Sequence, residues 1–360
     1  MDKHAFPRDK VCGDGLIPDA LSGLRRAGLY QQVAALGHPC STLSVYSASG
    51  IRVDIPGRFV TLRRRLLDHL LVQAAVAAGA GFRIGKVTEL REDPDGVTAA
   101  VDACPQEIRA RLAVLATGAD TSLTAPWGPG SSTRPNAVAA RCYVRSPIVV
   151  ERLVISFDRA IAPGYAWIFP LGNHEYNLGC GFFYGRNRGE KPNLRRTFDA
   201  FTRQFPIATS VWEHREEATS LVGAPLRCGL DSPTAYRGGR TLAVGEAIGA
   251  TYPFTGEGVG KAIETGEIAA EQIMVAMKAN DHTLLATLPQ LLRDRLAARY
   301  AGYRVAENWL ARAWLGDFVA SRVRRSSILQ QTAADVVNET ANPKDLFSWK
   351  RLLPEMIPWR

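Results

Sequence analysis

The chain has 360 residues, of which 46% are hydrophobic and 22% charged. This is the composition of a globular protein large enough for two lobes. The formal net charge is +9, mostly from dispersed arginine. No recognition motif accompanies it, which argues against nucleic-acid binding, while a solvated basic face and attraction to an anionic membrane both stay open.

Six cysteines are scattered along the chain without a Cys-x-x-Cys pair, and no cluster of His and Cys has metal-ligand spacing. We therefore expect free thiols and no metal. No segment has the pattern of a signal peptide, and no apolar run is long enough to span a bilayer. The expected location is cytoplasmic, with peripheral membrane contact as the alternative.

The first predicted elements are helical. Leucines and alanines at spacings of three and four predict a helix over 15–36 and a second over 62–78, which ends at Gly79. Short strands are then predicted over 82–90, 96–103 and 108–116.

After residue 136 the pattern changes. Alternating segments at 139–144 and 175–182 predict an antiparallel sheet, and a helix is expected over 194–205. A strand over 241–245 and a helix over 259–276 return to the pattern of a dinucleotide-binding fold, and the chain beyond 281 is largely helical.

The expected fold class is α/β, with an α+β lobe inserted into a Rossmann-like lobe. The expected boundaries are 1–122 and 223–280 for the dinucleotide-binding lobe, 123–222 for an antiparallel-sheet lobe that binds substrate, and 281–360 for a C-terminal helical cap.

The most informative pattern lies at 244–266, where an acidic turn and a glycine-rich bend separate the predicted strand from its helix. Glycines at 256, 258 and 260 let the backbone approach a ligand closely. The helix N-terminus presents N–H groups and a positive dipole end to an anion. The carboxylate of Glu246 can accept hydrogen bonds from a polyol. Together these features suit a flavin dinucleotide.

Five segments carry a resemblance, and they follow one another in the order Phe6–Leu16 (FPR-x-K-x-CG-x-GL), Arg64–Asp68 (R-x-x-x-D), Ala116–Gly118 (ATG), Tyr165–Pro170 (Y-x-W-x-FP) and Gly245–Gly260 (PFTGEG and its flanks). In this order they resemble the motifs of the geranylgeranyl reductase family. Its members are FAD-dependent flavoproteins with the para-hydroxybenzoate hydroxylase fold. The resemblance covers roughly residues 2–280.

Two features depart from the family. Asp2 stands where the family has its ribose-binding acid, so the first strand and the G-x-G-x-x-G turn that precede that acid are missing. There are three interpretations: a wrong start at an internal methionine, a truncated or decayed copy, and a working protein that binds flavin weakly or not at all. We expect the incomplete lobe to be poorly stable. The second departure is Glu246, which replaces the family's Asp.

The resemblance assigns cofactor-binding roles. It implies that Asp2 binds the adenosine ribose, Arg8 and Arg64 the pyrophosphate, and Val87 the adenine edge through its backbone. The alternatives are a disordered terminus for Asp2 and surface ion pairs for the arginines. The other implied contacts are Cys12, Gly13, Gly15, Gly118, Gly245, Glu246, Pro253, Gly256, Gly258 and Val259.

Catalytic and substrate-binding roles follow from the same resemblance. Cys12 would lie along the flavin at a helix N-terminus, where a thiol has a lowered pKa and could donate a proton; the alternative is a small packing residue. Tyr165, Trp167 and Phe169 alternate on a strand and share one face. In the family that face lines an isoprenoid pocket, and the alternative is ordinary sheet core.

The leading interpretation is an FAD-dependent oxidoreductase that reduces carbon–carbon double bonds of an isoprenoid, of the geranylgeranyl type or in the prenyl tail of a quinone or lipid. Hydride would come from N5 of the reduced flavin, and electrons from an external donor such as reduced nicotinamide or ferredoxin. One alternative is an FAD-dependent aromatic monooxygenase or halogenase of the same fold, although halogenases carry W-x-W-x-IP at the Tyr165 segment. Another is a non-catalytic remnant or lipid-binding protein with impaired FAD binding.

Overall fold

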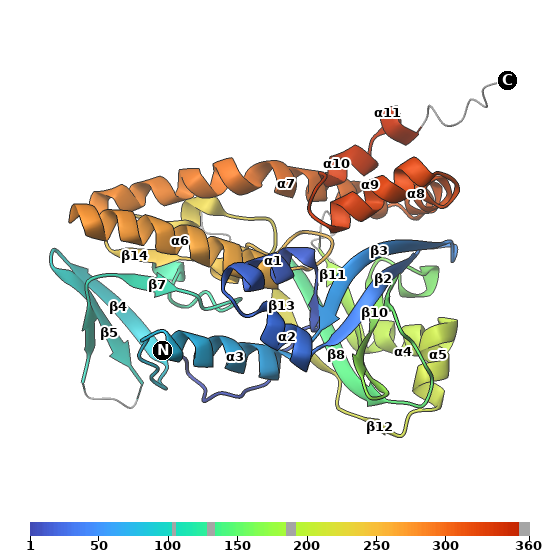
Figure 1. Cartoon of the computed structure of the whole chain (residues 1–360), viewed down its shortest axis with the longest axis horizontal. Coiled ribbons are helices and arrows are strands. Elements are labelled where there is room, and N and C mark those ends of the chain that lie inside the picture. Colours follow the sequence, from blue (N-terminus) through green and yellow to red (C-terminus); the bar gives the residue numbers. More distant parts are fainter. Residues whose placement is uncertain (103–105, 128–133, 185–191, 353–360) are drawn as a thin grey trace. The chain divides into compact units, whose positions relative to one another are not determined.

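The structure, a computed structural model, describes residues 1–102, 106–127, 134–184 and 192–352, which form two compact units (Figure 1). Unit 1 comprises Met1–Lys10, Arg64–Pro135 and Leu226–Ala298. Unit 2 comprises Val11–Arg63, Asn136–Pro225 and Arg299–Arg360.

Unit 1 combines two small sheets with long helices. Strands β7 and β14 pair in parallel, with Leu115 opposite Ala243, and β4, β5 and β6 form an antiparallel sheet. Asp2 forms an isolated parallel bridge with Ile84, so the N-terminal residues lie beside the segment that precedes β4. The strands are β4 (Val87–Asp93), β5 (Gly96–Val101), β6 (Ile108–Ala110), β7 (Ala113–Leu115) and β14 (Thr241–Ala243). The helices are α3 (Arg64–Ala77) and α6 (Val259–Ala279), with the 3₁₀ turns η1 (Ala125–Trp127), η3 (Ser232–Ala235), η4 (Gly245–Ile248) and η5 (His282–Thr287). Helix α7 (Leu288–Leu310) has residues in both units.

Unit 2 is built on one large sheet with the strand order β1-β3-β2-β9-β10-β11-β8-β12, in which β13 also pairs with β8. Strands β2 and β9 pair in parallel. The strands are β1 (Gly15–Leu16), β2 (His38–Tyr46), β3 (Arg52–Thr61), β8 (Ala137–Arg145), β9 (Leu153–Ser156), β10 (Tyr165–Gly172), β11 (Glu175–Phe183), β12 (Glu217–Ala218) and β13 (Val222–Leu226). The helices are α1 (Pro18–Arg26), α2 (Tyr30–Leu36), η2 (Arg159–Ile161), α4 (Leu194–Gln204), α5 (Pro206–Glu213), α8 (Ala313–Arg325), α9 (Ser327–Val337), α10 (Pro343–Leu346) and α11 (Trp349–Leu352).

The central strands of this sheet have two different faces, because successive residues of a strand point to opposite sides. Even-numbered residues such as Val144, Ile168 and Leu178 form an apolar core with the aromatic rings of α4 and α5. Phe201 is completely buried there, and burying such a ring contributes about 1.5–3 kcal/mol. Odd-numbered residues of β8, β10 and β11 form the other face, which carries polar and aromatic side chains.

The expected α/β fold class is confirmed, since helices combine with parallel and antiparallel sheets. The division of the chain differs from the expected one. Residues 11–63 fall in unit 2, because β2 and β3 pair with each other and β2 pairs with β9 in the large sheet. The chain after residue 299 also falls in unit 2, where α8 and α9 pack on β3.

The prediction of a single helix over 15–36 is wrong in two respects: the segment starts as a strand, and its helical part is interrupted. Gly15 and Leu16 pair with Thr61 and Val60 of β3, and two separate helices follow. The hairpin of β2 and β3 was not expected at all. Pro39 and Pro56 lie within these strands, and proline weakens the sequence signal of a strand.

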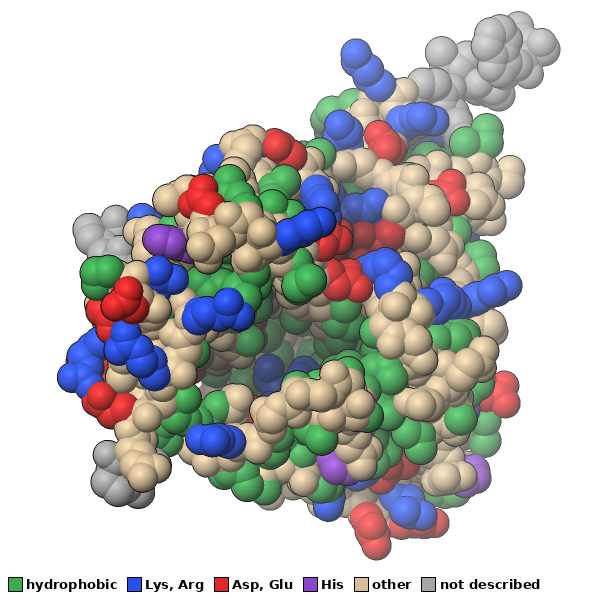
Figure 2. All heavy atoms as spheres, turned by 60° about the vertical axis from the view of Figure 1, so that its left-hand side comes forward, with side chains coloured by type: hydrophobic (Ala, Val, Ile, Leu, Met, Phe, Trp, Pro, Cys, Tyr) green, Lys and Arg blue, Asp and Glu red, His purple; other side chains and the backbone are tan. Residues whose placement is uncertain are grey.

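Acidic and basic side chains are interspersed on the face shown in Figure 2. On the β4–β6 sheet, Arg91 pairs with Glu107 and Arg109 with Asp93. Basic side chains of this sheet are therefore paired with acidic ones. Within the described ranges, no helix is long and apolar enough to cross a membrane, and no group of three or more His, Cys, Asp or Glu residues could hold a metal ion.

Candidate functional site

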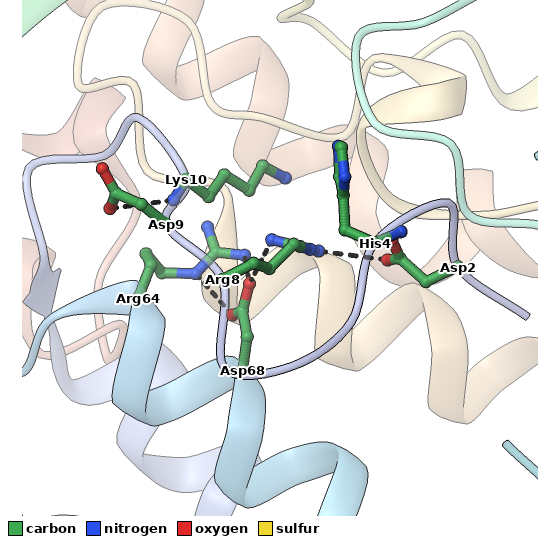
Figure 3. A network of polar contacts seen from close by, with 7 residues as sticks. All are labelled: Asp2, His4, Arg8, Asp9, Lys10, Arg64 and Asp68. Atoms are coloured by element: carbon green, nitrogen blue, oxygen red, sulfur yellow. Dashed lines mark hydrogen bonds and ion pairs between the residues drawn. The ribbon is translucent and has the colours of Figure 1, made fainter. Parts of the chain in front are cut away.

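A chain of alternating charges lies at the start of α3 in unit 1 (Figure 3). Arg64 is the first residue of that helix and Asp68 follows one turn later, so the two side chains face each other. Nε and Nη2 of Arg64 donate to the two oxygens of Asp68 at 2.7 and 2.9 Å. Arg8 donates to Asp68 at 3.1 Å and, through its other terminal nitrogen, to Asp2 at 3.2 Å.

Asp68 is the centre of this network, and its side chain is only 8% exposed. A buried carboxylate between two guanidiniums fixes their positions, because charge-assisted bidentate pairs are directional. The Arg8 guanidinium also lies 4.6 Å from the centre of the Phe6 ring. The structure thus brings together Asp2, Arg8 and Arg64, the predicted ligands of ribose and pyrophosphate, through a carboxylate that was not predicted as a site residue.

Glu246 projects from the η4 turn into a basic environment. Its Oε1 accepts a hydrogen bond of 3.1 Å from the backbone N–H of Arg227. Burial raises the pKa of the Glu246 carboxyl, while Lys10, Arg227 and Arg64 act in the opposite direction. The Arg227 guanidinium is itself buried and donates to the carbonyl of Ala247 at 2.5 Å, and burial lowers its pKa.

Gly118 borders the same carboxylate. It has a φ of +67°, and a Cβ at this position would lie 3.7 Å from both Oε2 of Glu246 and Nζ of Lys10. A side chain here would therefore enter the space beside this pair. Lys10 and Arg227 were not predicted as site residues. Lys10 stands in the Phe6–Leu16 segment, where the family motif includes a lysine and could have revealed it, whereas Arg227 lies in no motif.

The glycine block adopts the backbone that its composition predicts. Gly245 and Gly256 have φ values of +63° and +70°, in the left-handed region that favours glycine. At Gly258 a Cβ would lie 2.7 Å from Oγ1 of Thr251, so the close approach of the backbone requires glycine. This turn connects β14 and η4 to the long helix α6.

The N-terminus of α6 differs from the expectation in one respect. The helix begins at Val259 after Gly258, whose lack of a side chain leaves it without a side-chain cap. The N–H of Gly260 is bonded instead to the carboxylate of Glu257 at 2.7 Å. The dipole end is thus already partly satisfied by an acidic side chain of the turn.

Two other predicted cofactor residues occupy supporting positions. Val87 is the first residue of β4 and lies opposite Val101. Pro253 is buried in the loop between η4 and α6. Their contacts with a cofactor stay predictions.

In unit 2, three aromatic rings line one face of β10, as their alternation predicts. The ring centres are 5.8 Å apart for Tyr165 and Trp167, and 6.3 Å apart for Trp167 and Phe169. We refer to these three residues as the aromatic wall. Glycines on the neighbouring strand make room for it, because Gly179 and Gly181 lie opposite Trp167 and Tyr165 and a Cβ on either would clash with the ring.

The segment with the predicted catalytic cysteine lies against this wall. A Cβ on Gly13 would come within 3.3 Å of Phe169 and 3.5 Å of Nε1 of Trp167, and one on Gly15 within 3.1 Å of Phe169. Any larger residue at either position would push the segment away from the rings. Cys12 itself is half-buried.

Cys12 does not stand at the start of the helix that follows it in the chain. Helix α1 begins only at Pro18, after the short strand β1. The expected position of Cys12 at a helix N-terminus is therefore not found, since five residues separate it from α1.

Three other thiols of unit 2 are buried and unreactive. Burial raises the pKa of Cys40 to about 11 and that of Cys142 and Cys180 to about 12. Because the thiolate is the reactive form, these three stay inert near neutral pH. Cys104 lies outside the described residues.

Sequence reasoning missed a buried polar group beside the wall. Asp14 is 1% exposed, and its Oδ2 accepts hydrogen bonds of 2.8 Å from the hydroxyl of Tyr143 and from Nδ2 of Asn177. Trp167 in turn donates to Oδ1 of Asn177 at 2.9 Å. Asp14 stands inside the Phe6–Leu16 segment at one of its variable positions, while the two partners belong to no motif.

The predicted site residues thus fall into two sets. Unit 1 carries Asp2, Arg8, Arg64, Val87, Gly118 and the block from Gly245 to Val259. Unit 2 carries Cys12, Gly13 and Gly15 together with the aromatic wall. In unit 1 the structure joins Asp2, Arg8 and Arg64 in one network, and in unit 2 it places Gly13 and Gly15 against the aromatic wall.

Comparisons with known proteins find reductases among the relatives of this chain. A menaquinone reductase from Mycolicibacterium smegmatis is 28% identical over 381 residues, covering 89% of this chain and 90% of the relative. A digeranylgeranylglycerophospholipid reductase from Methanopyrus kandleri is 27% identical over 292 residues, covering 76% and 69%. No family model matches the chain.

Solved structures show the same fold. A geranylgeranyl bacteriochlorophyll reductase-like protein from Thermoplasma acidophilum superimposes with a TM-score of 0.73 at 18% identity, over 98% of this chain and 87% of that chain. The flavin-dependent brominase Bmp2 gives a TM-score of 0.70 at 18% identity, over 98% and 91%.

Fold, motifs and relatives together define the class of protein as an FAD-dependent oxidoreductase with a flavoprotein fold. Within that class, the chain is similar to menaquinone and digeranylgeranylglycerophospholipid reductases, which is consistent with the geranylgeranyl reductase family.

Proposed function

We propose that the polar cluster of unit 1 binds the dinucleotide part of FAD. The residues present fit such a ligand. Arg8, Arg64 and Lys10 supply positive charge for a pyrophosphate, and the carboxylates of Asp2 and Glu246 supply acceptors for ribose and ribityl hydroxyls. Gly118 leaves open the space beside Glu246 and Lys10 that a side chain would fill.

The proposed substrate is an isoprenoid attached to a polar group, with the prenyl tail of a quinone as the first candidate. The observation that carries this proposal is the aromatic wall, whose three rings form an extended apolar face beside the Cys12 segment. Such a face suits a hydrocarbon chain. The similarity to a menaquinone reductase over 89% of the chain supports a prenylated quinone as the substrate class.

The proposed reaction is the saturation of a tail double bond. Reduced FAD supplies a hydride to one alkene carbon when it is bound, and an external donor restores the reduced flavin. The other alkene carbon needs a proton. We assign that proton to the Cys12 thiol, which is half-buried beside the wall. The wall orients the tail and excludes water from the reacting carbons.

Mass spectrometry of the product tests this function. The protein is reconstituted with FAD, reduced chemically without oxygen, incubated with a prenylated naphthoquinone, and then exposed to air. A saturated tail retains the mass of two added hydrogen atoms, whereas a quinol formed by ring reduction is reoxidised to the starting mass. Recovery of the starting mass alone from flavin-loaded protein would contradict the proposal.

The oxygenase alternative predicts a different product. A brominase and a halogenase have a similar fold, so the product analysis also includes oxygenated products. A product that gains one oxygen atom in air, with no hydrogen added without oxygen, would replace the reductase by a monooxygenase.

A further inference from the structure

Asn177 joins three parts of unit 2 that are far apart in the sequence. It is completely buried on β11, on the same sheet face as the aromatic wall. Its Nδ2 donates to the backbone carbonyl of Cys12 and to Oδ2 of Asp14, both at 2.8 Å, and its Oδ1 accepts from Nε1 of Trp167 at 2.9 Å. One amide thus connects the wall to the segment with the cysteine.

The orientation of this amide is determined by chemistry. The indole of Trp167 can only donate, so the atom of Asn177 that faces it must be the oxygen. The NH₂ group then faces Cys12 and Asp14, where both partners are acceptors. Both amide hydrogens and the amide oxygen therefore have partners, and rotating the amide would oppose donor to donor.

Asp14 anchors the other end of the network. Its φ of +62° is uncommon for a residue other than glycine, although Asp and Asn tolerate it. Its carboxylate also accepts from the hydroxyl of Tyr143, whose ring lies 4.1 Å from the guanidinium carbons of both Arg63 and Arg141. A buried carboxylate that accepts from two donors, one of them on a ring packed between two guanidiniums, is strongly held in place.

We propose that Asn177 and Asp14 are positioning residues that hold the Cys12 segment against the aromatic wall. The geometry favours this role over simple packing, because the Asn177 side-chain amide bonds both the backbone carbonyl of Cys12 and the indole of Trp167, the central ring of the wall. This role rests on the proposed function, because the distance between the Cys12 segment and the wall would then be the distance between a proton donor and a bound prenyl tail. Neither residue need touch the substrate.

The test measures the alkylation rate of Cys12 by iodoacetamide, resolved from the other cysteines by peptide mass spectrometry. Asn177→Leu keeps the approximate shape and removes all three hydrogen bonds. Asp14→Gly accepts the left-handed backbone and removes the acceptor, whereas Asp14→Asn keeps an acceptor there. We expect alkylation of Cys12 to be about tenfold faster in the first two variants, because small displacements of a held group have large kinetic effects. Asp14→Asn should restore most of the wild-type rate.

Asn193→Ala is the matched control for lost stability. Asn193 caps α4 by accepting from the N–H of Arg196 at 3.1 Å, and α4 packs on the opposite face of the same sheet. Its loss destabilises unit 2 without touching the network. The half-buried Cys228 of unit 1 serves as the internal reference and should react at an unchanged rate in every variant.

Equal Cys12 rates in wild type, Asn177→Leu and Asn193→Ala would overturn the proposal and leave the network with a structural role only. If Asn177→Leu does not fold, the ratio of Asp14→Gly to Asp14→Asn decides in the same way. The alkylation test needs no substrate. If the wild type fails to saturate a prenyl tail while Cys12 still responds, the proposed function fails and the positioning role stands. If both hold, kcat for tail reduction should fall in Asn177→Leu about tenfold, with KM nearly unchanged.

Discussion

At the scale of single residues, burial decides what each ion pair contributes. Asp68 and Asp54 both receive a bidentate arginine, from Arg64 and Arg52 respectively, at distances of 2.6 to 2.9 Å. The Asp68 side chain is 8% exposed and the Asp54 side chain 43%. The same geometry therefore occurs once in a largely desolvated setting and once in water.

Replacement of the buried carboxylate is predicted to be the costlier change. Asp68→Asn leaves Arg8 and Arg64 without their shared counter-charge and should lower the free energy of unfolding by about 3 kcal/mol. Asp54→Asn should cost less than about 1 kcal/mol, because an exposed pair is screened. Urea unfolding of both variants measures the difference, and equal losses would refute the assignment of Asp68 as the centre of the network.

Glu246 makes stability depend on pH. Its pKa in the folded state is raised above the ordinary value of 4.5. Between these two values the folded chain holds a proton that the unfolded chain releases, so the contribution of this group to stability falls as pH rises through that window. Glu246→Gln lacks this dependence. It should gain stability relative to the wild type above the window and lose the advantage below pH 4.5. Thermal unfolding across pH checks this, and a constant difference would contradict it.

At the scale of elements, the alternation along β8 and β11 and the glycine turn before α6 could be predicted from local sequence. Each is determined by residues close together in the chain. The conformation of Gly15 and Leu16 could not, because it depends on pairing with β3 more than forty positions later, at Thr61 and Val60. Helical spacing in 15–36 therefore predicts one continuous helix where the structure has a strand and two helices.

The aromatic wall of β10 packs against glycines of β11, and this contact gives a prediction at the scale of elements. Gly179→Ala places a methyl group against the Trp167 ring and should cost about 2 kcal/mol through overpacking. Gly266→Ala is the matched control, because Gly266 lies inside α6 with open space around it. That change should be neutral or stabilise by up to about 1 kcal/mol, since alanine favours helix. Chemical denaturation of both variants should give opposite signs, and a harmless Gly179→Ala would show that the ring is not held where the structure places it.

At the scale of the whole molecule, the fold class followed from the order of motifs, and part of the candidate site followed from the motifs themselves. Arg8 and Arg64 could be predicted because each lies in a recognisable segment. The partners of Asp14 could not, since Tyr143 and Asn177 are 129 and 163 residues away and lie in ordinary strands. Such contacts arise only when the large sheet forms, and no local pattern encodes them.

The central claim is that this chain binds FAD through the cationic cluster and glycine turn of unit 1. The most direct measurement is the visible absorbance of the purified protein after incubation with FAD and removal of free flavin, for the wild type and Arg64→Gln. The wild type should retain about one FAD per chain, and Arg64→Gln should bind about tenfold more weakly, the equivalent of one charge-assisted hydrogen bond. A folded wild type that emerges without flavin would contradict the account.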